Sequence, residues 1–284
     1  MSSSDNTPRL PAAFALGARA RFRITGSDAA RYLGGQLSNR LPAVGSANEA
    51  LILTAKGKLC ARVFVFSQPD GSFLIDSDDI LRDALSARIS RYIVADDVEV
   101  EDISTEDAGW HLLGQPETTP VSGAVTVNRL GEPGVDVPKL PDRIPVLDAD
   151  QWNWLRICRG IPAWGSEIDE NTLPHEAGLE RSAVDFHKGC YVGQEVVSRI
   201  ESVGRTNRIL RGLLGDFPAT AASGLLDSQG HPAGRITSAT RHFGLATSAA
   251  LGYVNTRTTE TTLAVTDSEG LTIGHCQIHE FPLA

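Results

Sequence analysis

The stretch 188–195, with the sequence KGCYVGQE, gathers side chains that could do chemistry. It holds a thiol, an ammonium group, a phenol, a carboxamide and a carboxylate, together with two glycines that permit unusual dihedrals. A nearby positive charge or a helix N-terminus increases the thiolate fraction of a cysteine. Cys190 has Lys188 two residues before it and an expected helix from about Gly193. The residues alone leave two interpretations open: a reactive or ligand-binding centre around Cys190, or a capped turn with Cys190 buried.

Other signatures of catalysis or metal binding are missing from the sequence. It has no G-x-S-x-G, P-loop or H-E-x-x-H motif. Its four cysteines are too far apart for a C-x-x-C zinc site or a locally held iron–sulfur cluster, so no metal site is predicted. We expect Cys60, Cys158 and Cys276 to be buried and unreactive, because a free cysteine packs as a small hydrophobic residue.

The composition is that of a globular protein of two or three small domains, with 284 residues and a net charge of −9. That charge disfavours direct binding to nucleic acid. The acidic residues between 76 and 107 are interpreted as a solvated surface. No run of about 18 apolar residues or secretory leader is found, which predicts a cytoplasmic protein without a membrane partner.

The first hundred residues predict an α+β arrangement, which we expect to begin at about residue 19. The expected elements are a strand over 21–25, a helix from Ser27 or Asp28 to about Gln36, three strands within 49–78 with turns at AKGK and QPDG, a helix over 79–94 and a strand over 97–104. The helix over 79–94 rests on apolar residues at 81, 85, 89 and 93, a helical spacing.

The rest of the chain is less regular. Residues 115–150 are rich in Pro, Gly, Thr and Asp and predict short strands and loops. A short helix with an Asp cap is expected over 148–160, a long irregular loop follows, and a helix is expected over 196–202. From about Asn207 the short β runs predict a small all-β domain, either a barrel or a sandwich.

The segment 188–199, KGCYVGQEVVSR, closely resembles the signature of the YgfZ family. This family comprises the folate-binding relatives of the glycine-cleavage T protein (aminomethyltransferase). The resemblance covers nearly the whole chain. Weaker blocks are FRITGSDAARYLGGQLSNRL, the hairpin LTAKGKLCARVFVF, the segment RGIP with LPHEAGLERSAVDFHKGCYVGQE, and GRITSATRHFGLATSAALGYV.

The resemblance implies an α+β fold of T-protein-like folate-binding modules around a central cleft, with a small C-terminal β-barrel. It implies a folate-binding region over 1–205, made of two intertwined modules that divide near 110, and a barrel over 206–284. The implied cofactor is tetrahydrofolate or a one-carbon derivative. The implied partners are iron–sulfur client or assembly proteins, and the implied role is iron–sulfur cluster assembly or repair, including support of tRNA-modifying iron–sulfur enzymes.

By similarity, Cys190 is the functional thiol and Lys188 its positively charged neighbour. The expected folate contacts are Trp152, Tyr191, Gln194, Glu195 and Arg199. The flat indole of Trp152 suits stacking on a pterin. A second aromatic residue of some members corresponds to Arg19 here, whose guanidinium can also stack or pair with folate carboxylates.

Two departures from the T protein bear on catalysis. The acidic pair of the aminomethyltransferase hairpin corresponds to Ala61 and Arg62, and another glutamate corresponds to Cys158. Loss of a positioned acid or base costs about 10²–10⁴-fold in rate. We therefore expect folate binding without efficient aminomethyl transfer. A folate-dependent aminomethyltransferase and a scaffold that has lost folate binding are the alternatives.

Overall fold

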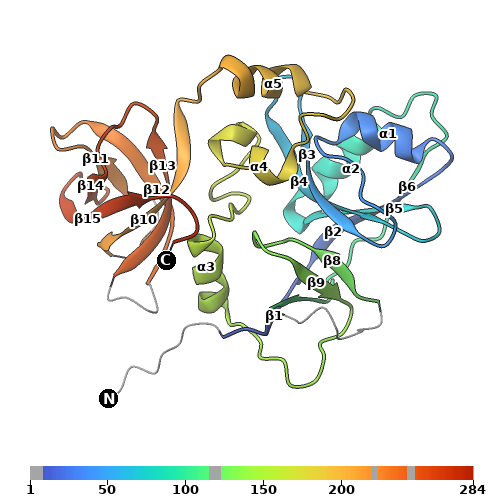
Figure 1. Ribbon diagram of the computed structural model, residues 1–284, viewed down its shortest axis with the longest axis horizontal. Helices are drawn as coiled ribbons and strands as arrows, with labels where there is room; N and C mark the ends of the chain where they lie inside the picture. Colours follow the sequence, from blue (N-terminus) through green and yellow to red (C-terminus); the bar gives the residue numbers. More distant parts are fainter. Residues whose placement is uncertain (1–8, 115–122, 219, 221–222, 242–246, 284) are drawn as a thin grey trace.

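The computed structural model describes residues 9–114, 123–218, 220, 223–241 and 247–283. These residues form a five-stranded sheet, a four-stranded sheet and a closed six-stranded barrel, with helices packed against them (Figure 1). The predicted α+β class with a C-terminal barrel is therefore confirmed.

The five-stranded sheet has the order β3-β4-β5-β2-β6. Its strands are β2 (Arg19–Thr25), β3 (Ala47–Leu53), β4 (Leu59–Ser67), β5 (Phe73–Asp78) and β6 (Glu99–Asp102). All five were predicted from alternation and turn signals. In β2 the alternation RARFRIT buries Ala20, Phe22 and Ile24 on one face and turns the arginines to the other.

Helices cover the apolar face of this sheet. They are α1 (Ala29–Gln36), the 3₁₀ turn η1 (Asp79–Leu81) and α2 (Arg82–Ser90). Leu81, Leu85 and Ile89 pack against Phe22 and other sheet residues in one core, as their spacing predicted. Full burial of such a side chain stabilises the fold by about 1.5–3 kcal/mol.

The four-stranded sheet has the order β1-β7-β9-β8. Its strands are β1 (Ala12–Ala15), β7 (Trp110–Leu113), β8 (Val125–Val127) and β9 (Gly134–Val137). The expectation that the fold begins near residue 19 was wrong, because Ala12 pairs with Leu113 and Ala15 with Trp110. The expected loops over 115–122 lie outside the described residues.

The irregular middle of the chain carries short helical segments. They are α3 (Ala149–Cys158), the 3₁₀ turn η2 (Pro174–Glu176), α4 (Glu180–Ala183) and α5 (Gln194–Val203). The predicted Asp cap of α3 is Asp148, whose side chain accepts a hydrogen bond from the Gln151 backbone N–H at 2.8 Å. The Asp148 backbone N–H donates to Oε1 of Gln151 at 3.1 Å, which completes a capping box.

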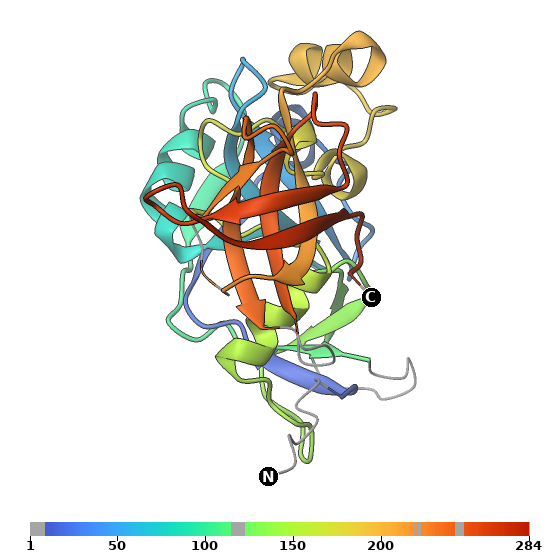
Figure 2. The ribbon, with the colours of Figure 1, turned by 90° about the vertical axis from the view of Figure 1, so that its left-hand side faces the viewer.

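The C-terminal strands close into a barrel of order β10-β13-β12-β11-β14-β15 around a core that contains Leu213, Ile236 and Val265 (Figure 2). The strands are β10 (Arg208–Asp216), β11 (Gly224–Leu226), β12 (Pro232–Arg241), β13 (Ser248–Asn255), β14 (Thr262–Thr266) and β15 (Thr272–His279). Because the strands close on themselves, the barrel has no free strand edge. Of the two predicted alternatives for this all-β domain, the barrel is therefore the one observed, and the sandwich is not.

Helix α3 joins the barrel to the four-stranded sheet. Its Ile157 packs against Leu251 and Tyr253 of β13, whereas Leu155 packs in one cluster with Phe14 and Leu113. The region boundaries near 110 and 205 stay predictions.

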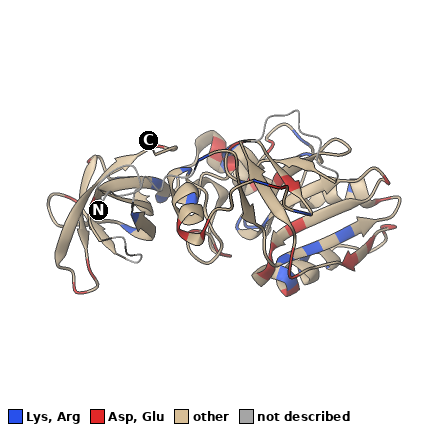
Figure 3. Cartoon of the chain, turned by 90° about the horizontal axis from the view of Figure 1, so that it is seen from below, with Lys and Arg blue, Asp and Glu red and all other residues tan. Residues whose placement is uncertain are grey.

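Acidic and basic residues are interspersed over the chain rather than separated onto opposite ends (Figure 3). Within the described residues, no helix is long and apolar enough to cross a membrane.

Candidate functional site

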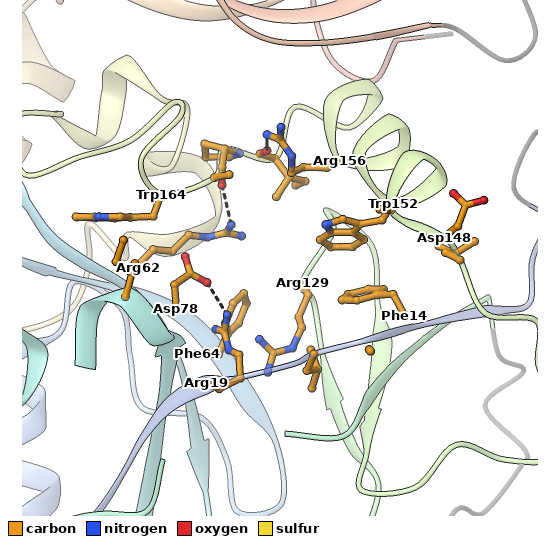
Figure 4. Close-up of a pocket in the computed structure, with 18 residues that line it drawn as sticks. Phe14, Arg19, Arg62, Phe64, Asp78, Arg129, Asp148, Trp152, Arg156 and Trp164 are labelled. Atoms are coloured by element: carbon orange, nitrogen blue, oxygen red, sulfur yellow. Dashed lines mark hydrogen bonds and ion pairs between the residues drawn. The ribbon is translucent and has the colours of Figure 1, made fainter. Parts of the chain in front are cut away.

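A cavity of about 510 Å³ opens between the two sheets and α3. Its wall combines aromatic rings, guanidinium groups and two carboxylates (Figure 4). The side chains that give it this character are Phe14, Phe64, Trp152, Trp164, Arg19, Arg62, Arg129, Arg156, Asp78 and Asp148. Such a volume and lining are typical of a small-molecule site.

One side of the cavity is an aromatic pair. The rings of Phe14 on β1 and Trp152 on α3 have centroids 3.9 Å apart and planes tilted by 36°. Trp152 was predicted as a ligand contact from the resemblance, and the structure places it in the cavity wall. Phe14 was missed, because its strand lies before the residue at which the fold was expected to begin. The apolar run AAFA was the available signal.

The facing side stacks guanidinium groups on a phenyl ring. The guanidinium carbon of Arg129 lies 4.4 Å from the centroid of Phe64, and that of Arg62 lies 5.3 Å from it. Arginine favours such stacking because its charge is delocalised over a flat group. The cavity therefore has flat surfaces on both sides (Figure 4).

Buried carboxylates hold the arginines of the cavity in place. Asp76, which is fully buried, accepts hydrogen bonds from Arg19, Arg21 and Arg129. Burial would raise the pKa of Asp76, but the three guanidinium groups hold it well below its usual range. The interpretation of the acidic residues over 76–107 as a solvated surface was wrong for Asp76, because its partners come from distant segments.

The network continues into the four-stranded sheet. Arg129 donates to both oxygens of Asp136, and the Nδ1 atom of His111 lies 2.7 Å from Asp136. Burial lowers the pKa of His111, and its contact with Asp136 opposes that shift. The two sheets are therefore joined by ionised groups as well as by apolar packing.

The altered hairpin places a cation in the cavity wall. Ala61 is fully buried, whereas Arg62 reaches the cavity, pairs with Glu49 through Nε and donates to the Pro162 carbonyl at 3.3 Å. Its Nη2 atom makes no hydrogen bond within the described residues. Arg19, by contrast, uses all three guanidinium nitrogens on Asp76 and Asp78.

The stretch KGCYVGQE is a turn that leads into α5. Gly193 is the N-cap residue of α5 with φ +90°, and a Cβ atom there would lie 2.6 Å from the Thr54 carbonyl oxygen. Gly57 of the AKGK turn, with φ +73°, is packed against Val196 of α5. The two glycines therefore let the octapeptide lie directly on the hairpin.

The ammonium group of Lys188 contacts the carbonyl end of α1. It donates to the carbonyl oxygens of Gly34, Leu37 and Asn39 at 2.9, 2.6 and 3.0 Å. Burial lowers the pKa of Lys188 to about 8, with Asp185 opposing the shift. The three N–H donors of the ammonium group are thus all used on backbone carbonyls.

Cys190 is exposed, so the interpretation that buries it in a capped turn is wrong. Of the other cysteines, Cys158 and Cys276 are buried and Cys60 is only half-buried. Burial raises the pKa of the Cys158 thiol to about 12 and that of Cys276 to about 11. Cys190 is therefore the thiol most accessible to solvent.

Of the predicted site residues, Trp152 and Arg19 line the large cavity. The others that the sequence analysis named are absent from the described residues of its wall: Lys188, Cys190, Tyr191, Gln194, Glu195 and Arg199. Tyr191 is buried beside α5, and Glu195 and Arg199 are exposed. The part of the chain that the structure describes holds no group of three or more His, Cys, Asp or Glu arranged to bind a metal.

The sequence is similar to curated proteins that are named either for iron–sulfur cluster assembly or for tRNA modification. It is 31% identical over 232 residues to "Iron-sulfur cluster assembly factor IBA57 homolog, mitochondrial" of Chaetomium globosum, covering 66% of this chain and 53% of that protein. It is 29% identical over 273 residues to "Iron-sulfur cluster assembly factor IBA57, mitochondrial" of Mus musculus, covering 82% and 76%. It is 25% identical over 232 residues to "tRNA-modifying protein YgfZ" of Yersinia pestis, covering 71% and 70%.

The chain spans about half the length of the Chaetomium globosum relative. No family model matches the sequence.

Among solved structures, the crystal structure of glycine cleavage system aminomethyltransferase T from Bartonella henselae is similar, with a TM-score of 0.80. The likeness covers 96% of this chain and 86% of that chain at 17% sequence identity. At that identity it establishes the fold alone.

Proposed function

Because the chain belongs to the YgfZ family and shares the fold of the glycine-cleavage T protein, we propose that it is a tetrahydrofolate-binding accessory protein. Its role is to support the assembly or repair of iron–sulfur clusters and of iron–sulfur enzymes such as those that modify tRNA. The names of the relatives support this role, and the large cavity supports the ligand.

The observation that carries the ligand proposal is the pair of flat surfaces in the cavity. The Phe14–Trp152 pair and the Phe64–Arg129 stack suit the two faces of a pterin. The free Nη2 atom of Arg62 suits a carbonyl or carboxylate of the ligand. Bound tetrahydrofolate would supply a carrier for a one-carbon unit, and the residues named here bind and orient it.

Titration with tetrahydrofolate tests the ligand proposal. Trp152 and Trp164 both line the cavity, so tryptophan fluorescence should change to saturation and calorimetry should give the same Kd. Phe14→Leu should weaken binding by about tenfold through lost stacking. Phe217→Leu, within the barrel core, is the matched control and should keep the wild-type Kd in the folded protein. If tetrahydrofolate changes neither the tryptophan fluorescence nor the heat of titration, folate binding would be excluded and a scaffold role favoured.

Cys190 is proposed as the residue through which the protein serves its iron–sulfur partners, since its thiol is exposed. Cells that lack the wild-type protein should not recover iron–sulfur enzyme activity with Cys190→Ala, whereas Cys60→Ala should restore it. Full complementation by Cys190→Ala would remove this role and leave the folate proposal standing.

Aminomethyl transfer is the second candidate, favoured by the likeness to the T protein. Arg62 is ion-paired with Glu49 where the T protein has an acidic hairpin residue, so this candidate lacks that acid. Release of methylenetetrahydrofolate from an aminomethylated carrier by the purified protein would establish it.

We also propose a cytoplasmic location. The names of the fungal and mouse relatives give a mitochondrial one, and cell fractionation distinguishes the two.

A further inference from the structure

A separate cavity of about 480 Å³ lies between the end of α5 and the barrel. Its wall comes from η2, α4, α5, the connection over 204–207, the start of β10 and the turn that follows β13. Figure 1 shows the chain running from α5 to β10 of the barrel. This α5–barrel cavity shares no lining residue with the large cavity. Its volume lies within the roughly 300–1,000 Å³ of small-molecule sites, so it has room for a whole small ligand.

Two arginines of this wall have no partner. The side chains of Arg205 and Arg257 are exposed and make no hydrogen bond or ion pair with any residue that the structure describes. The neighbouring Arg208, by contrast, pairs with Glu176 at 3.0 Å. A guanidinium group presents its N–H donors in a flat fork that matches a phosphate or a carboxylate. The two arginines therefore favour an anionic group at the open part of the cavity.

The buried part of the wall carries hydrogen-bond acceptors. His175 is only 8% exposed, and its Nδ1 atom has no hydrogen-bond partner among the described residues. Its Nε2 atom lies 3.2 Å from Oε2 of Glu201, so Nε2 carries the proton of the neutral imidazole and Nδ1 is an acceptor. Glu180 adds an Oε2 atom that is also buried and unpartnered in this part of the chain. Buried polar atoms are rarely left unpaired, so a ligand that donates hydrogen bonds suits this end of the cavity.

The remaining lining narrows the class of ligand. Ile200 and Ile209 supply apolar surface, and none of the described lining residues is Phe, Tyr or Trp. A nucleotide base would therefore find no aromatic face to stack on. A sugar needs no such face, and its hydroxyl groups are hydrogen-bond donors of the kind that His175 and Glu180 lack.

We propose that the α5–barrel cavity binds a sugar phosphate. The phosphate lies between Arg205 and Arg257, and hydroxyl groups of the sugar donate to His175 and Glu180. The bound ligand contacts α5, the connection over 204–207 and the barrel together, so it holds the end of α5 against the barrel. This site is independent of the cavity proposed for tetrahydrofolate.

Calorimetric titrations with ribose 5-phosphate, methyl phosphate and inorganic phosphate test the proposal. Ribose 5-phosphate should bind wild-type protein about tenfold more tightly than methyl phosphate, because methyl phosphate lacks the hydroxyl donors. Arg257→Gln should weaken the binding of ribose 5-phosphate by about tenfold, because the phosphate loses a charged donor. Arg235→Gln, at an exposed arginine of β12 outside the cavity, is the matched control and should keep the wild-type Kd.

The buried end of the cavity has its own test. Glu180→Ala should reduce the ratio of the methyl phosphate Kd to the ribose 5-phosphate Kd. If this variant does not fold, the comparison of the two ligands on wild-type protein still tests the hydroxyl contacts. Ribose 5-phosphate should also slow amide hydrogen exchange over 200–209 in wild-type protein and in Arg235→Gln, but much less in Arg257→Gln at the same ligand concentration.

Each contrary outcome overturns a stated part of the proposal. Equal Kd values for the three phosphates would show a plain anion site and overturn the sugar contacts. Tighter binding of AMP than of ribose 5-phosphate would assign the cavity to nucleotides instead. Absence of binding, or binding that Arg257→Gln leaves unchanged, would overturn the site altogether. None of these outcomes bears on tetrahydrofolate, because the two cavities share no lining residue.

Discussion

At the scale of single residues, the contacts of Lys188 change the role that we assign to it. The sequence placed an ammonium group two residues from a thiol, which suggested that Lys188 activates Cys190. In the structure the ammonium group donates to three carbonyls at the end of α1, where a helix carries partial negative charge. Its donors are therefore used in holding the octapeptide to α1. We interpret Lys188 as a positioning residue.

Replacing Lys188 by Met distinguishes positioning from activation. Three carbonyls lose a shared donor, so the free energy of unfolding should fall by about 1–3 kcal/mol and amide hydrogen exchange should quicken over Gly34–Asn39. Lys56→Met, at an exposed lysine of the neighbouring hairpin, is the control and should change neither quantity. Unchanged stability with slower thiol modification of Cys190 would instead support activation.

At the scale of elements, the sequence predicted what local periodicity determines. The strands of the five-stranded sheet, α2 and the capped start of α3 follow from alternation, helical spacing and an Asp cap. Strand β1 and the burial of Asp76 could not be predicted in this way. β1 is stabilised by pairing with β7, about a hundred residues later, and Asp76 by Arg19, Arg21 and Arg129. Trp152 was predicted as a site residue from the family resemblance, whereas Phe14 was identified as one only once the structure placed β1 beside α3.

The contact between the stretch 188–195 and the hairpin gives a prediction for Gly189 and Gly193, the two glycines of that stretch. Gly193→Ala forces a side chain into a left-handed conformation and against the Thr54 carbonyl, so the free energy of unfolding should fall by about 1–3 kcal/mol. Gly189→Ala is the matched control within the same octapeptide, because a Cβ atom there meets nothing within 4 Å. It should change stability by no more than about 0.5 kcal/mol. Urea denaturation of both variants measures the difference, and equal effects would contradict the packing argument.

The link between the two sheets predicts a dependence on pH. Burial lowers the pKa of His111 below its usual 6.5, so the unfolded chain binds its proton more readily than the folded protein. Stability from this group is therefore present above about pH 6.5 and is lost as the pH falls below that value, by at most about 1.4 kcal/mol per pH unit.

Urea denaturation between pH 7 and pH 5 measures this loss. Compared with wild type, His111→Gln should show a smaller dependence of the free energy of unfolding on pH. The control His187→Gln replaces an exposed histidine and should keep the wild-type dependence. Identical slopes in all three proteins would show that His111 does not contribute.

At the scale of the whole molecule, the barrel and the cavity are connected through one buried carboxylate. Glu167, in the irregular loop before η2, accepts hydrogen bonds from Arg156 of α3 at 2.8 Å and from Ser238 of β12. Arg156 also lines the large cavity, and the Tyr253 hydroxyl of β13 donates to the Glu167 carbonyl at 2.9 Å. The position of the barrel is thereby tied to the cavity wall.

Glu167→Gln tests this connection. The change leaves the buried Arg156 cation without its anion, so the free energy of unfolding should fall by about 3–5 kcal/mol. The Kd for tetrahydrofolate should also rise, because Arg156 would no longer be held at the cavity. Glu170→Gln, at an exposed position of the same loop, should leave both quantities unchanged. Loss of stability with an unaltered Kd in the folded fraction would mean that the barrel stabilises the molecule without shaping the cavity.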